Sequence, residues 1–225
     1  MNIIPALMIR NEEYYIREVV QPLVDVFGVV LVCDTGSKDK TLSILASIPG
    51  VMVVQFGECS PRGLTEVRRD MMRLCKAYGA SHVLLVDGDE LYSREALELI
   101  KNYSIPDGGI TGFTTMLTLD PDEHNNNLWE MNDPFTRHCL LPVDDIWDGE
   151  YPYDVPSSYA DPAGYFYYPH TPNSRYHAVH LHRLQRSSLD GNTMLRREKQ
   201  FQFGLQNLPN IVKTIPYSYP LKKEI

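Results

Sequence analysis

The chain has 225 residues, with 29 Asp and Glu against 21 Lys and Arg, so its formal net charge is −8. This length suits one large domain, or one domain with an appendage, because single hydrophobic cores stop growing near about 250 residues. Hydrophobic residues make up 43% and charged residues 22% of the chain, which excludes wholesale disorder. The acidic balance argues against nonspecific nucleic-acid binding, which needs many cations to neutralise phosphates. A polyanion held locally by a metal ion or a few arginines is still compatible with it.

The sequence contains no stretch that predicts a membrane span or a targeting signal. No run approaches the about 20 apolar residues that cross a bilayer. The apolar residues 1–8 lack a basic n-region and meet Arg10 too soon for a secretion signal. The four cysteines show no Cys-x-x-Cys spacing, and Cys33 and Cys75 lie in apolar or helical runs. We therefore expect a cytoplasmic protein with buried thiols, without a disulfide framework or a structural zinc site.

The first half of the chain alternates short apolar runs with amphipathic stretches. The apolar runs predict strands at residues 3–8, 29–33, 51–56 and 82–86. The stretches between them predict helices at residues 12–26, 40–48 and 64–78, with Pro22 kinking or ending the first and Ser37 or Asp39 capping the second. Runs that are apolar on both faces fit parallel strands covered by helices on each side. The sequence therefore predicts an α/β fold with right-handed crossovers.

Beyond Asp87 the alternation breaks. We predict a short helix at residues 93–102 and strands at residues 112–119, 137–141 and 177–181, paired in a mixed or antiparallel fashion. Residues 151–176 are rich in Tyr, Pro, Ser and Asp, which is typical of a functional lid or a disordered loop. A last helix is predicted at residues 190–204. We expect one domain at residues 1–204 and a C-terminal tail at residues 205–225.

A polar segment with the sequence DTGSKDKT, residues 34–41, directly follows the strand predicted at residues 29–33. Open α/β sheets bind ligands beyond the carboxyl ends of their strands. Gly36 permits a tight turn, and Asp34 is placed to accept hydrogen bonds from a donor such as a base N–H. The alternative is a plain turn, in which the Ser, Asp and Thr side chains cap the next helix. The segment is no phosphate loop, because neither G-x-G-x-x-G nor G-x-x-x-x-G-K-[ST] occurs.

An acidic segment, Asp87-Gly88-Asp89-Glu90, ends the strand predicted at residues 82–86. Side chains alternate along a strand, so Asp87 and Asp89 are expected on the same side. Two such carboxylates repel each other unless a cation lies between them. Carboxylates suit Mg²⁺ or Mn²⁺, which bridge protein and substrate phosphates, and Gly88 leaves room for a ligand. An acidic solvated turn is the alternative.

A histidine pair, His180 and His182, lies on one face of the strand predicted at residues 177–181. Neutral imidazole is a common nitrogen ligand of Mn²⁺, although two histidines spaced by one residue are a weak signal. The pair gains meaning because it would complete a metal site with Asp87 and Asp89.

Two further groups of charged residues are candidates for a site. Arg62, Arg68 and Arg69 lie at or near the helix predicted at residues 64–78, where solvent exposure is the plainer explanation. Carboxylates gather around the sequence WDG at residues 147–149, any one of which is a candidate general base: Asp144, Asp145, Asp148, Glu150 and Asp154.

In this order and spacing the segments resemble the GT-A fold glycosyltransferases of family 2. Members open with a strand and an N-E pair, here Asn11-Glu12. A D-x-G-S-x-D-x-T motif follows, matched in full by Asp34, Gly36, Ser37, Asp39 and Thr41. An arginine-bearing helix and a D-x-D motif, here residues 87–89, come next. The resemblance therefore covers the first half of the chain.

The second half resembles a branch of that family that includes peptide glycosyltransferases. The branch has an arginine-bearing strand, a W-x-G motif, and a late metal-binding histidine before a basic helix, here Arg137, Trp147-x-Gly149, His180 and residues 196–199. Its His-acid pair is absent here, and Asp154 is the nearest acidic residue.

The resemblance implies an inverting, metal-dependent transfer of a sugar from a UDP-sugar. It implies a GT-A, Rossmann-like mixed sheet with a nucleotide-binding half at residues 1–102 and an acceptor-binding half at residues 103–204. The implied donor-binding residues are Glu12, Glu13, Asp34, Gly36, Ser37, Arg68, Arg69, Asp87 and Gly88. Among them Asp34 would bind uracil, and Arg69 or Arg68 would lie near the diphosphate or sugar.

The implied metal ion is Mn²⁺ or Mg²⁺. Asp89 would bind it directly, Asp87 would approach it and the ribose, and His180 or else His182 would complete its coordination. The implied catalytic base is Asp154, with Asp148 or Glu150 as the other candidates.

Several alternatives stay open at the level of sequence, as do the sugar and the oligomeric state. The acceptor is a peptide, a saccharide or a hydroxylated base in DNA, and DNA would need a positive strip such as Arg183, Arg186, Arg196, Arg197 and Lys199. A nucleotidyltransferase shares the layout but usually has a Gly-rich basic loop, whereas residues 5–13 contain no glycine. A non-catalytic nucleotide-sugar-binding module is the third class.

Overall fold

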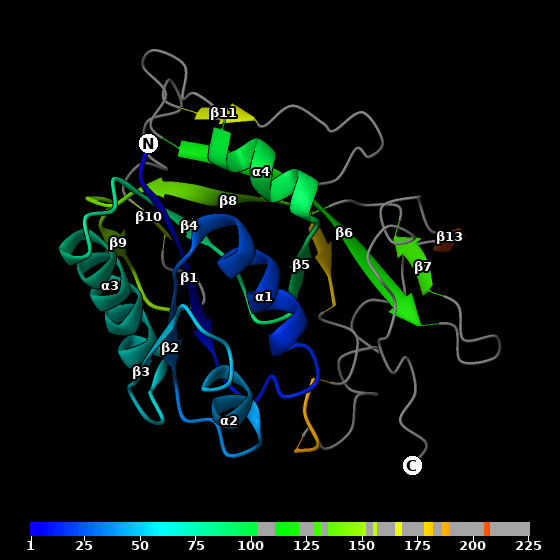
Figure 1. The fold of residues 1–225 in the computed structure, drawn as a ribbon, viewed down its shortest axis with the longest axis horizontal. Coiled ribbons are helices and arrows are strands. Elements are labelled where there is room, and N and C mark those ends of the chain that lie inside the picture. Colours follow the sequence, from blue (N-terminus) through cyan, green and yellow to red (C-terminus); the bar gives the residue numbers. More distant parts are fainter. Residues whose placement is uncertain are drawn as a thin grey trace.

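The structure is a computed structural model of the chain (Figure 1). It describes residues 1–102, 111–121, 128–131, 135–151, 155–156, 165–167, 178–181, 186–189 and 205–207. The predicted helix at residues 190–204 and most of the predicted loop and tail lie outside these residues. No helix in the described ranges is long and apolar enough to cross a membrane.

The first half follows the predicted alternation of strands and helices. Its elements are β1 (Ile3–Ile9), α1 (Ile16–Phe27), β2 (Val30–Asp34), α2 (Thr41–Leu45), β3 (Val51–Gln55), α3 (Pro61–Ala77), β4 (His82–Leu85), β5 (Glu90–Tyr92) and α4 (Arg94–Asn102). The later elements are β6 (Thr111–Pro121), β7 (Leu128–Met131), β8 (Phe135–Pro142), β9 (Trp147–Asp148), β10 (Val155–Pro156), β11 (Tyr165–Tyr167), β12 (Ala178–His180) and β13 (Leu205–Asn207).

One mixed sheet organises the molecule, so the predicted α/β class is confirmed. Its main path runs β13-β7-β6-β8-β4-β1-β2-β3. The strands β4, β1, β2 and β3 are parallel, and β8 joins β4 in the antiparallel sense. The short strand β12 pairs in parallel with β6 and antiparallel with β5. Through β12 a late segment of the chain reaches the end of β4.

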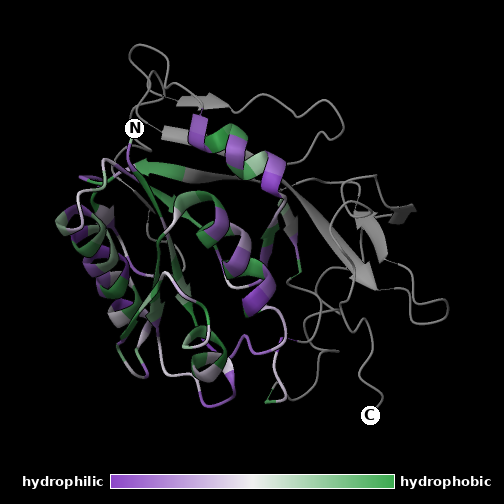
Figure 2. Cartoon of the chain, viewed as in Figure 1, coloured by the Kyte–Doolittle hydropathy of each residue, from purple (hydrophilic) through white to green (hydrophobic). Residues whose placement is uncertain are grey.

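Two cores cover the two faces of the parallel strands. Along β2, Val30 and Val32 pack with the buried faces of α1, α2 and α4, whereas Leu31 and Cys33 pack with α3. This alternation explains why β2 is buried along its full length. Figure 1 shows the strands between α3 on one side and α1 and α2 on the other, and Figure 2 shows apolar strands beneath helices with polar outer faces.

The boundaries of α1 differ from the prediction in two ways. The helix begins at Ile16 and not at residue 12, because residues 10–15 form a loop in which Asn11 has a left-handed backbone with φ of 56°. Pro22 does not end it: the helix continues to Phe27 and closes on Gly28, whose φ is 84°. Burial of Leu23 and Val26 outweighs the hydrogen bond that proline cannot donate.

Helix caps also differ from the prediction. Lys40 stands at the cap position of α2, although Asp39 Oδ1 does accept a hydrogen bond from the backbone N of Thr41 at 2.9 Å. Ser60 caps α3 by accepting from the backbone N of Gly63 at 3.2 Å, with Pro61 as the first residue of the helix.

Candidate active site

A cavity of about 300 Å³ lies where β1, β2 and β4 end. These parallel strands leave their carboxyl ends at one edge of the sheet, the usual place for ligands in such folds. The cavity is lined by Met8, Ile9, Arg10, Glu12, Thr35, Cys59, Leu64, Arg68, Asp87, Gly88, Asp89, Tyr151, His180 and Arg186. Among the predicted site residues, Glu12, Arg68, residues 87–89 and His180 are therefore brought together.

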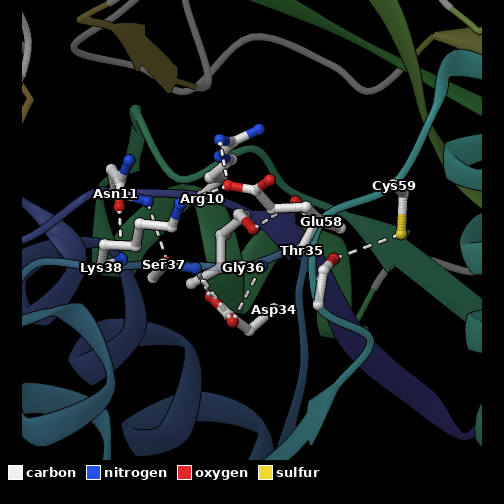
Figure 3. A network of polar contacts seen from close by, with 11 residues as sticks. Arg10, Asn11, Asp34, Thr35, Gly36, Ser37, Lys38, Glu58 and Cys59 are labelled. Carbon is white, nitrogen blue, oxygen red and sulfur yellow. Dashed lines mark hydrogen bonds and ion pairs between the residues drawn. The ribbon is translucent and has the colours of Figure 1, made fainter.

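Asp34 and the loop after it form a network of polar contacts, shown in Figure 3, next to the cavity-lining residue Thr35. The Asp34 carboxylate is 2% exposed and accepts hydrogen bonds from the backbone N of Gly36 at 3.1 Å and of Ser37 at 3.2 Å. Ser37 Oγ in turn accepts from the backbone N of Asn11 at 2.9 Å, and Asn11 Oδ1 accepts from the backbone N of Lys38 at 2.8 Å. Asp34, Gly36 and Ser37 do not line the cavity; they hold the turn that borders it.

Gly36 is required by its backbone conformation and by its surroundings. Its φ is +97°, which side-chain-bearing residues rarely adopt. A Cβ on this residue would lie 2.9 Å from Cγ of Glu58 and 3.0 Å from the Glu58 backbone N. Glu58 is fixed there by ion pairs with Arg10 at 3.2 Å and with Lys38 at 2.6 Å (Figure 3).

The end of the same motif binds the loop that follows β1. The backbone N of Glu12 donates to Thr41 Oγ1 at 2.8 Å, and the backbone N of Glu13 donates to Asp39 Oδ2 at 3.3 Å. Glu13 Oε2 accepts from the backbone N of Lys40 at 3.2 Å. The segments N-E-E and DTGSKDKT thus stabilise each other. The side chain of Glu13 does not line the cavity.

The acidic segment after β4 contributes two carboxylates, Asp87 and Asp89, to the lining of the cavity. Asp89 is 3% exposed, with Oδ1 at 3.5 Å from His180 Nε2 and Oδ2 at 3.1 Å from Arg186 Nη1. The backbone N of Leu181 donates to the carbonyl oxygen of Asp89 at 2.7 Å. Half-buried Asp87 borders the same cavity. Pairing of β12 with β5 is what carries His180 to this place.

The absence of a side chain at Gly88 leaves room for a neighbouring carboxylate, that of Glu12. A Cβ on Gly88 would lie 2.6 Å from Cγ and 3.0 Å from Cδ of Glu12. Glu12 therefore packs directly against the backbone between Asp87 and Asp89. Glu12 Oε1 forms an ion pair with Arg186 Nη1 at 3.0 Å.

The acidic surroundings act on the protonation of His180. Burial alone would lower the pKa of this imidazole, but the hydrogen bond with Asp89 and the negative charges of Asp89, Glu90 and Asp87 outweigh burial. The net effect is that the pKa of His180 is raised above its ordinary value.

The two arginines of α3 have different surroundings. The Arg68 guanidinium lies 4.6 Å from the ring centre of Trp147 and 4.8 Å from that of Tyr151, at the cavity wall. Arg69 Nε and Nη2 donate to the carbonyl oxygen of Trp147 at 2.8 and 2.7 Å. Arg68 is therefore the arginine that can meet a ligand, whereas Arg69 attaches β9 to α3.

Of the predicted catalytic carboxylates, the structure describes Asp148 and Glu150. Asp148 and Glu150 are exposed and do not line the cavity. Tyr151 does line it, and its backbone N donates to Thr65 Oγ1 at 2.9 Å. Asp154 and His182 lie outside the described residues, so their roles stay predictions.

Arg186 is one of the cavity-lining residues that the sequence did not assign to this site. The sequence indicates it only as part of a basic strip for DNA, and no spacing rule joins it to Glu12 or Asp89. Its backbone is held by the N–H of Tyr14, which donates to the Arg186 carbonyl at 3.0 Å. The nearby Ser188 N donates to Glu13 Oε1 at 2.7 Å.

The donor atoms of the site can be compared with those that a divalent cation needs. Within the described ranges, no group of three or more His, Cys, Asp or Glu side chains is arranged to hold a metal ion. The Asp89 carboxylate and the His180 imidazole are neighbours and could supply two of the ligands of a metal ion. Asp87 lines the same cavity. Oxygen and imidazole donors together fit Mn²⁺ in their chemistry.

Comparisons with known proteins concern the fold. Neither a family model nor a curated protein matches the sequence. Structural matches include S. aureus TarS in complex with UDP-GlcNAc, at 23% identity and a TM-score of 0.38 over 56% of this chain and 36% of that one. Glucosyl-3-phosphoglycerate synthase from Mycobacterium tuberculosis, in complex with Mn²⁺, UDP and glucosyl-3-phosphoglycerate, matches at 21% identity and a TM-score of 0.40 over 52% and 43%.

A structure of 4-diphosphocytidyl-2C-methyl-D-erythritol synthase also matches, at 12% identity and a TM-score of 0.44 over 64% of this chain and 76% of that one. The likeness in each case is one of fold alone. The matches span less than half the length of the TarS and glucosyl-3-phosphoglycerate synthase chains.

Proposed function

We propose that the chain is a metal-dependent, inverting glycosyltransferase that moves a sugar from a UDP-sugar to an acceptor hydroxyl. The observation that supports this most is the grouping of Asp87, Asp89 and His180 on one cavity at the carboxyl ends of the parallel strands. The motif order of the sequence, which resembles glycosyltransferase family 2, agrees with that grouping.

The leaving group of such a reaction explains the proposed roles. When the glycosidic bond breaks, the nucleoside diphosphate gains negative charge. A divalent cation held by Asp89 and His180 would supply the positive charge that stabilises this leaving group. Arg68, held between two aromatic rings, adds a fixed positive charge at the cavity wall. Asp87 is proposed to orient the donor, and Asp154 is the proposed base.

The surroundings of Arg186 bear on the acceptor. A DNA acceptor would require a basic strip, and Arg186 is the member of that strip that lies within the described residues. Its guanidinium pairs with Glu12 and Asp89. That pairing removes it from a phosphate-binding surface and favours a peptide or saccharide acceptor. A gel shift titrated with salt tests the point, because phosphate contacts lose affinity steeply as salt rises.

The test of the function measures UDP release from a panel of UDP-sugars in the presence of Mn²⁺. We expect release by the wild type and a loss of at least about a hundredfold with Asp89→Asn, since one preorganised charge contributes that much to a rate. Asp70→Asn is the matched control, because Asp70 carries the same group in an exposed pair with Arg73 on α3. Equal release by wild type and Asp89→Asn would refute the metal assignment. Pyrophosphate release from a nucleoside triphosphate would indicate nucleotidyl transfer instead.

A further inference from the structure

One guanidinium nitrogen joins two buried carboxylates at the cavity. Arg186 Nη1 lies 3.0 Å from Glu12 Oε1 and 3.1 Å from Asp89 Oδ2. The side chains of Glu12 and Asp89 are each 5% exposed, and that of Arg186 is 19% exposed. Buried carboxylates need a partner of opposite charge, because water does not screen their repulsion. Among the described residues, Arg186 pairs with both of these carboxylates.

The backbone around Arg186 is held independently of its side chain. The carbonyl of Arg186 accepts from the backbone N of Tyr14 at 3.0 Å, and the backbone N of Ser188 donates to Glu13 Oε1 at 2.7 Å. The main chain of residues 186–189 therefore attaches this segment to the loop after β1, through the backbone of Tyr14 and the side chain of Glu13. The guanidinium can leave Asp89 without detaching the segment.

Asp89 has one oxygen turned to each of two partners. Oδ1 faces His180 Nε2 at 3.5 Å, and Oδ2 faces Arg186. A divalent cation held between Asp89 and His180 would lie within a few ångströms of the guanidinium, and like charges at that separation repel strongly in a partly buried site. The divalent cation and the guanidinium therefore compete for the single negative charge of Asp89.

Resting on the function proposed above, we propose that Arg186 is the built-in counter-ion of Glu12 and Asp89 and that a divalent cation displaces it from Asp89 on binding. Arg186 then keeps its pair with Glu12 and turns a positive charge toward the cavity. Arg186 is thus a positioning residue that sets the affinity for the cation. The consequence is opposite to that of an ordinary site residue: removing the Arg186 charge tightens metal binding.

The test measures Mn²⁺ affinity without nucleotide, by calorimetry or by the paramagnetic resonance signal of free Mn²⁺. We expect Arg186→Gln to bind Mn²⁺ about tenfold tighter than the wild type, equivalent to about 1.4 kcal/mol. Arg94→Gln is the matched control: it removes the same charge from an exposed pair with Glu98 on α4 and leaves Mn²⁺ affinity unchanged. Asp89→Asn is expected to abolish binding and so to locate the ion.

Arg186→Gln leaves Glu12 and Asp89 facing each other in a buried place, so its fold is checked by circular dichroism. Should it fail to fold, the double variant Glu12→Gln with Arg186→Gln removes one negative and one positive charge together and carries the same expectation. Unchanged or weaker Mn²⁺ affinity in the folded variant overturns the inference and leaves the proposed function standing. If the wild type binds no Mn²⁺ in either condition, with UDP or without it, the inference about Arg186 and the proposed metal-dependent function are both overturned.

Discussion

Replacing Gly88 by alanine tests the packing of Glu12 against the acidic segment. The new Cβ would lie 2.6 Å from Glu12 Cγ, 3.0 Å from Glu12 Cδ and 3.2 Å from Ile9 Cγ2. Carbon atoms in contact are normally about 3.5–4.0 Å apart, so the Glu12 side chain must move. Because Glu12 Oε1 lies 3.0 Å from Arg186 Nη1, that movement disturbs the buried ion pair.

The size of the effect follows from the cost of overpacking. Forcing extra atoms into a packed interior costs about 1–3 kcal/mol. We therefore expect Gly88→Ala to lower the free energy of unfolding by about 2 kcal/mol, which for a chain of this size lowers the melting temperature by about 4–8 °C. Thermal unfolding, monitored by circular dichroism, measures this change in melting temperature.

A double-mutant cycle with Glu12→Ala isolates the contact. Glu12→Ala removes the two Glu12 carbon atoms that the new methyl group would strike and leaves Ile9 Cγ2 in place. Gly88→Ala should then cost at least about 1 kcal/mol less in the Glu12→Ala background than in the wild type. An equal cost in both backgrounds would refute the reasoning, because the strain would then arise from Ile9 or from the backbone.

Three further outcomes follow from the same structure. Gly36→Ala should lower the free energy of unfolding by about 1–3 kcal/mol in urea titrations, because its backbone is left-handed; a neutral result would contradict the role of this turn. Arg69→Ala should cost about 1–3 kcal/mol in the same assay, because the Trp147 carbonyl loses both donors, and an unchanged midpoint would show that β9 is held otherwise. Burial raises the pKa of Asp39, but hydrogen bonds, that of Ser187 first, outweigh it and the net pKa is lowered. Asp39 therefore stabilises the fold above its ordinary pKa and loses this contribution as the pH falls through the lower folded pKa, so Asp39→Asn should flatten that acid-induced loss.

The D-x-G-S-x-D-x-T motif has a structural role that its resemblance to a donor-binding loop does not suggest. Asp34 accepts hydrogen bonds from the turn that follows it, and Thr41 accepts one from the backbone of Glu12. These contacts fix the loop after β1, which carries Glu12 to the acidic segment. The motif therefore shapes the cavity through the residues it holds. Its predicted contact between Asp34 and uracil stays a prediction.

The first half of the fold was predictable because its signals are local. Apolar runs without polar interruption marked β1, β2 and β4, and they lie within one or two residues of the predicted bounds. The predicted start of α1 at residue 12 was wrong, because residues 12–15 have a helical pattern but Glu12 and Glu13 are bound to the loop after β2. No local pattern records that contact.

The sequence by itself determined the alternation of elements and the identity of the acidic segment, since both depend on residue type and short spacing. The tertiary structure decided which charged residues meet. It separated Arg68 from Arg69, which differ only in the direction of their side chains from α3. It also brought Arg186 to Glu12 and Asp89, because β12 pairs with β5 and the main chain after it binds the loop after β1. Contacts between segments so distant in the chain arise from packing of the sheet, and no spacing in the sequence encodes them.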